Sequence, residues 1–180
     1  MSLRLFVALA IPDAVAETLW PLQAGVPGAR WQKREQLHLT LRFIGEVDGH
    51  QAAAIDDVLV AIAAPSFPLA LKAVGSFGGR TPRDLWAGVA PSEALLHLQR
   101  KIESALQRIG LEPEPRKFVP HVTLARLKAA QGPVVADYLS DHARYRSPEF
   151  PVESFCLYSS KLSSDGSIYC VEREYALRLV

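Results

Sequence analysis

His38-Leu39-Thr40-Leu41 is repeated later in the chain as His121-Val122-Thr123-Leu124. The chain contains five histidines but only four threonines in 180 residues. By chance alone, two or more of the histidines would have a threonine at the second following position in roughly one of 200 sequences of this composition. The repeat is therefore a motif, and it predicts two histidines with related roles.

Each motif lies in a predicted β-strand, because apolar and polar residues alternate through 37–44 and 119–127. Side chains two residues apart on a strand share a face, so we expect His38 beside Thr40 and His121 beside Thr123, with the leucines and Val122 facing a core. An imidazole exchanges protons near neutral pH, and a threonine hydroxyl can bond a phosphoryl oxygen. The motifs predict a phosphate held from both sides, with one histidine taking a proton while the other gives one.

A structural role or a zinc site could also explain histidines in such a chain. His50, His97 and His142 fall in predicted helices without a threonine partner, which indicates ordinary surface or packing roles. Two motif histidines could supply two zinc ligands, but zinc sites use three or four protein ligands, and no HExxH or paired-cysteine spacing completes the set. We therefore expect a site without metal.

Length and charge limit the class of protein. The 180 residues are 49% hydrophobic and carry a net charge of +1, which fits one domain and does not favour a long nucleic-acid duplex as the partner. Basic residues nevertheless flank both motifs. Solvated surface charge explains most of them, yet the setting fits a short anionic ligand such as a nucleic-acid terminus. The flanking residues are Arg30, Lys33, Arg34 and Arg42, then Arg116, Lys117, Arg126 and Lys128.

We predict neither a membrane span nor a secretion signal from this sequence. No apolar run approaches the roughly 18 residues of a membrane span. Residues 4–16 have some features of a signal peptide, but the basic region is a single arginine and the apolar run is short. Cys156 and Cys170 predict two free thiols, although a bond across adjacent strands stays open. We expect a cytoplasmic protein without membrane contact.

The order of predicted elements is duplicated. Residues 5–12 and 85–91 are similar apolar strands that end at a proline, and each precedes a helix, a turn-rich stretch, a motif strand and a second helix. The first predicted helix carries Val15, Leu19 and Leu22 and meets Pro21, which should end or kink it. The other predicted helices cover 48–64, 92–110 and 133–140. Further strands are expected over 68–75, 150–159 and 167–179.

This duplication predicts an α+β fold rather than a doubly wound nucleotide fold. No glycine-rich turn leads from a strand into a helix, and residues 75–79 lack the Lys-Ser/Thr ending of a phosphate-binding loop. We expect a pseudo-two-fold molecule in which two antiparallel-rich sheets form a central cleft and the helices lie outside. Residues 1–180 would form a single bilobal domain, most simply a monomer, with one motif in each lobe.

Five segments together resemble the two-histidine (2H) phosphoesterase superfamily, and within it the RNA 2′,3′-cyclic phosphodiesterases, also called 2′-5′ RNA ligase-like proteins. They extend over nearly the whole chain and keep both motifs intact: 4–9, 37–45, 85–89, 118–126 and 157–160. The resemblance implies the bilobal, LigT-like fold of that superfamily and chemistry without metal or other cofactor. It implies RNA ends or nucleosides bearing a 2′,3′-cyclic phosphate as substrates, hydrolysed to a 2′-phosphate.

The resemblance also implies roles for the histidines and threonines. His38 would be the proton donor and His121 the proton acceptor, an assignment that two chemically equivalent motifs do not make by themselves. Thr40 and Thr123 would bind the non-bridging phosphate oxygens.

Two arginines are further candidates for phosphate binding. Arg126 matches a family position that contacts phosphate, but strand alternation points it away from His121, so a twist or bulge would have to redirect it; a surface role is the alternative. Arg42 lies in phase with His38. Phe43 and Tyr158 could stack on a base, although packing in the core is the simpler expectation for Phe43.

Two other functions stay open on the sequence. The same two histidines could run the reverse reaction and join RNA ends through a 2′-5′ bond, because catalysts act in both directions. The cleft could also serve a non-catalytic nucleotide- or RNA-binding module, since a motif and a fold do not guarantee catalysis.

Overall fold

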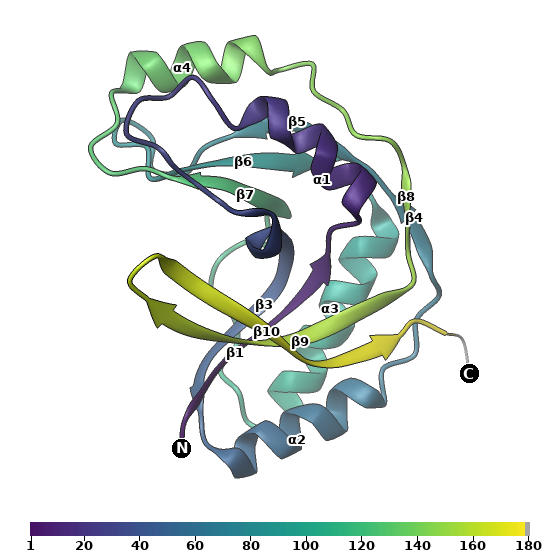
Figure 1. Cartoon of the computed structure of the whole chain (residues 1–180). Coiled ribbons are helices and arrows are strands. Elements are labelled where there is room, and N and C mark those ends of the chain that lie inside the picture. Colours follow the sequence, from purple (N-terminus) through teal and green to yellow (C-terminus); the bar gives the residue numbers. More distant parts are fainter. Residues whose placement is uncertain (179–180) are drawn as a thin grey trace.

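The computed structural model describes residues 1–178 (Figure 1). Leu179, the last residue of the strand expected over 167–179, lies outside the described residues, as does Val180. Within residues 1–178, no helix is both long and apolar enough to cross a membrane.

The elements follow the predicted order closely. The helices are α1 (Asp13–Leu19), α2 (Gly49–Val60), α3 (Glu93–Arg108) and α4 (Gly132–Asp141), with short 3-10 turns η1 (Trp20–Leu22) and η2 (Arg34–Gln36). The strands are β1 (Leu3–Ala10), β2 (Arg30–Trp31), β3 (His38–Val47), β4 (Phe67–Leu69), β5 (Leu71–Gly75), β6 (Asp84–Val89), β7 (His121–Arg126), β8 (Phe150–Val152), β9 (Ser154–Ser163) and β10 (Gly166–Ala176). The proline at position 21 ends α1 and lies in η1, as expected.

Eight strands form one curved antiparallel sheet in the order β10-β9-β1-β3-β7-β6-β5, with β2 paired to β7. Figure 1 shows α2 and α3 with the half that contains β1, β3, β9 and β10, and α1 and α4 with the half that contains β5, β6 and β7. Strands β4 and β8 make a separate small sheet. The α+β, two-half architecture is confirmed, with one difference: the two expected sheets are continuous, because β3 and β7 pair at Leu39 and Val122.

Helix α3 shows how the sequence builds the core beneath the motif strands. The Ser92 hydroxyl caps the helix by accepting a hydrogen bond from the Leu95 amide at 3.1 Å. The apolar side chains of its inner face, spaced three and four residues apart, are fully buried in the main core: Leu95, Leu98, Ile102 and Leu106. Each such side chain contributes about 1.5–3 kcal/mol on burial, so this face anchors the helix to the sheet.

The motif strands bury the residues that alternation assigns to the core. Leu39, Leu41, Val122 and Leu124 are at most 3% exposed, whereas the histidines and threonines between them stay partly exposed. The other face of each strand is therefore the one that carries the motif side chains. The apolar N-terminal segment is β1, which lies inside the sheet between β3 and β9.

Both motif strands contain a bulge directly after the threonine. Ala8 pairs with Thr40 and Val7 with Arg42, so β3 has one residue more than β1 at Leu41. In the other half, Trp86 pairs with Thr123 and Leu85 with Ala125, so β7 has one residue more than β6 at Leu124. An extra residue reverses the alternation beyond it. Arg42 and Ala125 are accordingly buried, and the next residues, Phe43 and Arg126, are exposed.

The cysteines remain free thiols. Cys156 is buried on β9 and Cys170 is exposed on β10. Their strand register explains the lack of a bond, because Cys156 faces Glu174 and Cys170 faces Ser159.

Candidate active site

The antiparallel pairing of β3 with β7 brings the two motifs together. Leu39 pairs directly with Val122, so the flanking residues place His38 opposite Thr123 and Thr40 opposite His121. Paired residues of antiparallel strands lie about 4.5–5.5 Å apart at their Cα atoms. Strand alternation places all four polar side chains on the face opposite Leu39 and Val122, where imidazole and hydroxyl alternate with two-fold symmetry.

Each imidazole is fixed by the same local hydrogen bond. His38 Nδ1 lies 2.8 Å from the carbonyl oxygen of Gln36, and His121 Nδ1 lies 2.7 Å from that of Val119. A carbonyl only accepts, so Nδ1 carries the proton and donates it in both rings. Nε2 is therefore the nitrogen left for chemistry: it accepts a proton when the ring is neutral and donates one when the ring is charged.

His38 is enclosed by aromatic rings. Its ring centroid lies 4.9 Å from Phe6 and 5.0 Å from Tyr169, which meets it edge-on. This burial lowers the pKa of His38 to about 4, against the opposing effect of the Gln36 carbonyl, and the charges of Arg126 and His121 lower it further. His38 is consequently neutral at pH 7 in the free protein. The effect of these two charges also indicates that Arg126 and His121 lie near His38.

His121 borders an open cavity. Its centroid lies 5.0 Å from Phe77, which meets it edge-on, and 5.7 Å from Trp86. The cavity has a volume of about 480 Å³, and its lining includes both His121 and Thr40. His121 and Thr40 thus border a solvent-accessible cavity whose volume is typical of small-molecule binding sites.

Arg126 lies where the bulge in β7 returns its side chain to the motif face. Regular alternation would point Arg126 away from His121. The extra residue at Leu124 reverses the alternation, so Arg126 lies on the same face as His121. Arg126 is exposed and is not in an ion pair among residues 1–178. Its guanidinium can therefore receive an anion next to His38.

Phe43 occupies the matching place in the other half, five residues after its histidine. It is 39% exposed and the Arg4 guanidinium lies 5.2 Å from its ring centroid, so the expectation that it packs in the core is wrong. Tyr158, in contrast, is buried: it is only 9% exposed and its ring stacks on Phe6. Of the two rings, Phe43 is the one that a ligand can reach.

The expectation that Arg42 shares the face of His38 is also wrong. The bulge at Leu41 turns its side chain into the protein, where it is 7% exposed. It forms an ion pair with Glu103 of α3 and donates to the carbonyl oxygens of Phe43 and Glu112. All three guanidinium nitrogens of Arg42 thus already donate to protein acceptors.

The Arg42–Glu103 pair holds the segment that leads into the second motif. Arg42 bonds the Glu112 carbonyl, and the Glu103 carboxylate accepts a hydrogen bond from the Glu114 amide at 3.0 Å. Burial raises the pKa of Glu103, but hydrogen bonds from Gln107 and Arg42 outweigh it and keep the pKa below its usual value. The same segment ends at Val119, whose carbonyl orients His121. No sequence pattern marks this anchoring role.

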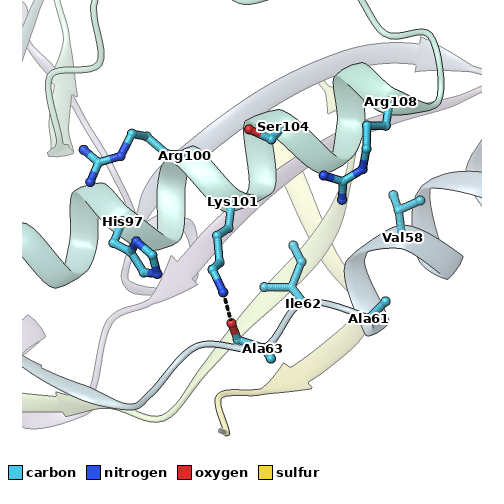
Figure 2. Close-up of a pocket in the computed structure, with 9 residues that line it drawn as sticks. All are labelled: Val58, Ala61, Ile62, Ala63, His97, Arg100, Lys101, Ser104 and Arg108. Carbon is cyan, nitrogen blue, oxygen red and sulfur yellow. Dashed lines mark hydrogen bonds between the residues drawn. The ribbon is translucent and has the colours of Figure 1, made fainter. Parts of the chain in front are cut away.

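A second cavity, of about 430 Å³, lies on a different face of α3 (Figure 2). His97, Arg100 and Arg108 line it, and Lys101 donates a hydrogen bond to the Ala63 carbonyl beyond the end of α2. It contains no residue of either motif. His97 is the one histidine among the lining residues of this cavity.

The described residues also provide no obvious metal site. Within 1–178, no group of three or more histidine, cysteine, aspartate or glutamate side chains is placed to hold a metal ion. The chemistry available at the motif face is that of two imidazoles, two hydroxyls and one guanidinium.

Several known proteins are similar to this chain in sequence and fold. A protein of Archaeoglobus fulgidus named RNA 2′,3′-cyclic phosphodiesterase is 32% identical over 93% of this chain and 96% of its own length. A protein of the same name from Thermotoga maritima is 33% identical over 94% of this chain and 92% of its own. The crystal structure of E. coli LigT complexed with 3′-AMP superposes with a TM-score of 0.79 at 27% identity, over 98% of this chain and 99% of LigT. The crystal structure of a Thermus thermophilus protein gives a TM-score of 0.83 at 28% identity, over 98% of both chains.

A family model gives the assignment. The model described as the 2′-5′ RNA ligase superfamily matches residues 11–163, which include both histidine motifs and more than half of the chain. The chain therefore belongs to the 2′-5′ RNA ligase superfamily.

Proposed function

We propose that this protein hydrolyses RNA 2′,3′-cyclic phosphate ends to 2′-phosphates, using His38 and His121 as its acid–base pair. One observation carries the proposal: two imidazoles on paired strands are held by identical Nδ1–carbonyl hydrogen bonds that leave both Nε2 atoms available. The relatives named RNA 2′,3′-cyclic phosphodiesterase support the choice of substrate.

The reaction needs two proton transfers and one displacement at phosphorus. A water molecule attacks phosphorus opposite the 3′-oxygen, and the base removes its proton as the new P–O bond forms. The bond between phosphorus and the 3′-oxygen breaks, and the acid protonates that oxygen. The product is a 2′-phosphate with a free 3′-hydroxyl. Two imidazoles on opposite sides of one phosphate meet both requirements.

The low pKa of His38 bears on which histidine is the acid. If His38 donates the proton, as the resemblance implies, it has to take one up when substrate binds, and the negative charge of the phosphodiester favours that uptake. If His38 is the base, its neutral ring is ready at pH 7. A substrate whose 3′-oxygen is replaced by sulfur separates the two assignments, because a thiolate leaves without being protonated. If His38 is the acid, His38→Gln should hydrolyse this substrate at nearly the wild-type rate while losing activity on the ordinary cyclic phosphate. If His38 is the base, the variant should lose activity on both.

The other motif-face groups bind the phosphate in this proposal. Thr40 and Thr123 donate hydrogen bonds to the two non-bridging oxygens, and Arg126 balances the charge that develops on them. Arg42 has no part in phosphate binding, because its donors contact Glu103 and two carbonyl oxygens.

Product analysis tests the function directly. Adenosine 2′,3′-cyclic phosphate incubated with the purified chain and EDTA should yield 2′-AMP. Formation of 3′-AMP would contradict the proposed leaving group, and dependence on added metal would contradict the acid–base mechanism. Binding without turnover would indicate a binding module, and joining of RNA ends as the faster reaction would indicate a ligase.

A further inference from the structure

The cavity beside His121 extends well beyond the space that a phosphate needs. It lies between β3, the loop that follows β5 and the segment that precedes β7, and its volume is about 480 Å³. Arg83 and Phe77 come from the first of these segments, and Lys117 and Phe118 from the second. A substrate whose phosphorus lies at the histidines would therefore have room for a further part of the molecule here.

The cavity carries an excess of positive charge. Four cationic side chains and two carboxylates line it, apart from His121. Glu103 is paired with Arg42 and Glu114 with Arg116, whereas Arg83 and Lys117 are in no ion pair among residues 1–178. Hydrogen bonds from Arg116 hold the pKa of Glu114 below its usual value, so both carboxylates are ionised and already neutralised. The unpaired cations are the groups left to attract an anion.

The two walls that carry these cations are held by internal hydrogen bonds. The Arg83 amide donates to the Phe77 carbonyl at 2.9 Å, and the buried Asp84 carboxylate accepts from the Phe77 amide at 2.7 Å. The opposite wall is anchored by the Arg42–Glu103 pair. Two flexible cationic side chains thus project from backbone that is fixed before a ligand binds, which reduces the entropy cost of binding.

The covalent structure of the substrate indicates which anionic group would lie beside Arg83 and Lys117. A 2′,3′-cyclic phosphate is bonded to both the 2′- and 3′-oxygens of the last nucleotide. The rest of the RNA strand is therefore attached to that nucleotide through its 5′-oxygen. The next anionic group is therefore the 5′-phosphate of the terminal nucleotide. A free nucleoside cyclic phosphate lacks this group.

We propose that Arg83 and Lys117 form a subsite for the 5′-phosphate of the terminal nucleotide. The inference rests on the proposed function, which places the cyclic phosphate between the two histidines. The subsite would give an RNA end an additional contact that a free nucleoside cyclic phosphate, which has no 5′-phosphate, cannot make. The 5′-phosphate would be bound by charge and hydrogen bonding, without a covalent step.

The second basic cavity provides a matched control. Arg100 and Arg108 of α3 line it, and no motif residue is among its lining residues (Figure 2). If positive charge anywhere on the molecule increased affinity for a second phosphate, removing these arginines would act like removing Arg83 and Lys117. A subsite next to the histidines predicts that it does not.

The test compares adenosine 2′-monophosphate with adenosine 2′,5′-bisphosphate, which differ only in the 5′-phosphate. Calorimetry on the full chain should show about tenfold tighter binding of the bisphosphate, corresponding to about 1.4 kcal/mol. The Arg83→Ala/Lys117→Ala variant should bind both within about twofold, whereas Arg100→Ala/Arg108→Ala should keep the tenfold preference. Because all four side chains are exposed, thermal melting should confirm that both variants fold.

The outcomes separate this inference from the proposed function. Equal affinity of the wild-type chain for both nucleotides would overturn the subsite, as would a preference that survives in Arg83→Ala/Lys117→Ala or disappears in the arginine control. The proposed function fails in a different way, if the chain binds both nucleotides but does not hydrolyse the cyclic phosphate. The binding preference can be measured in either case because neither nucleotide is turned over.

Discussion

The two motif halves share a backbone design but differ in the side chains that it presents. In each half the histidine Nδ1 bonds the carbonyl two residues earlier, and an extra residue follows the threonine. Beyond the bulge, the first half buries Arg42 and exposes Phe43, whereas the second buries Ala125 and exposes Arg126.

This difference suggests why a symmetric frame suits an asymmetric substrate. A nucleotide has an anionic phosphate and a flat, neutral base, so one side of the site needs a guanidinium and the other an accessible ring. The bulges deliver Arg126 and Phe43 to equivalent places on the motif face. The halves also differ below the surface, since Arg42 anchors a long segment and Ala125 anchors nothing comparable.

The two motif histidines, one in each half, should give the largest effect on turnover. His38→Ala and His121→Ala should each lower turnover of the cyclic phosphate by about 10²–10⁴-fold, because each removes one proton transfer. The double variant should lose far less than the product of the two factors, since the residues act as a unit. His97→Ala on α3 is the control and should be unchanged in steady-state kinetics. Near-normal turnover in either single variant would show that the halves are not equivalent in chemistry.

The buried Arg42–Glu103 pair, which has no counterpart in the second half among residues 1–178, should give the next largest effect. Arg42→Met leaves the Glu103 carboxylate without its partner and should lower the free energy of unfolding by about 3 kcal/mol in urea titrations. Arg42→Met/Glu103→Met removes both charges and should recover most of that loss. A double variant as unstable as the single one would mean that the packing of Arg42, and not its charge, supports this half.

The exposed residues after the bulges should differ in what they bind. Arg126→Ala should weaken inhibition by inorganic phosphate by about tenfold or more, because a charge-assisted hydrogen bond contributes about 1.5–3 kcal/mol. Phe43→Ala should leave phosphate inhibition unchanged and weaken only ligands that carry a base. The comparison requires inhibition constants for phosphate and for 2′-AMP with both variants. Equal losses for phosphate would contradict the division of roles.

The enclosure of His38 should appear as a pH dependence of stability. Its pKa is lowered from 6.5 to about 4 on folding, so the unfolded chain binds a proton first as the pH falls. The folded state therefore loses stability below pH 6.5, by about 2 kcal/mol at pH 5 for this group. His38→Gln lacks this loss, so the difference between variant and wild type should shift by that amount between pH 7.5 and pH 5. Parallel stability curves would contradict the pKa.

Much of the fold could be predicted from local patterns. The helix expected over 92–110 is α3 at 93–108, and the one expected over 133–140 is α4 at 132–141. Apolar spacing, the Ser92 cap of α3 and the proline in the first turn of α4 are local signals that act within a few turns. The single strands expected over 68–75 and 150–159 are each divided in two, into β4 and β5 and into β8 and β9, and the short strand β2 was not predicted. Two or three residues carry little alternation, and the pairing that defines such strands comes from distant segments.

The site was predicted in part. The positions of His38 and Thr40 follow from alternation, but the places of Arg42 and Phe43 do not, because a bulge exists only relative to a partner strand. Tyr158 illustrates the same limit. Its burial against Phe6 depends on the pairing of β9 with β1, about 150 residues away in sequence.

By itself, the sequence determined the duplicated motif, the strand face that its four polar residues share, and the order of helices and strands. Only the tertiary structure decided which side chains follow the bulges onto that face, how far the pKa of His38 falls, and which segment the Arg42–Glu103 pair anchors. The physical reason is range. Alternation and helical spacing arise from neighbouring residues, whereas bulges, desolvation and buried ion pairs arise from strands and helices that are far apart in the chain.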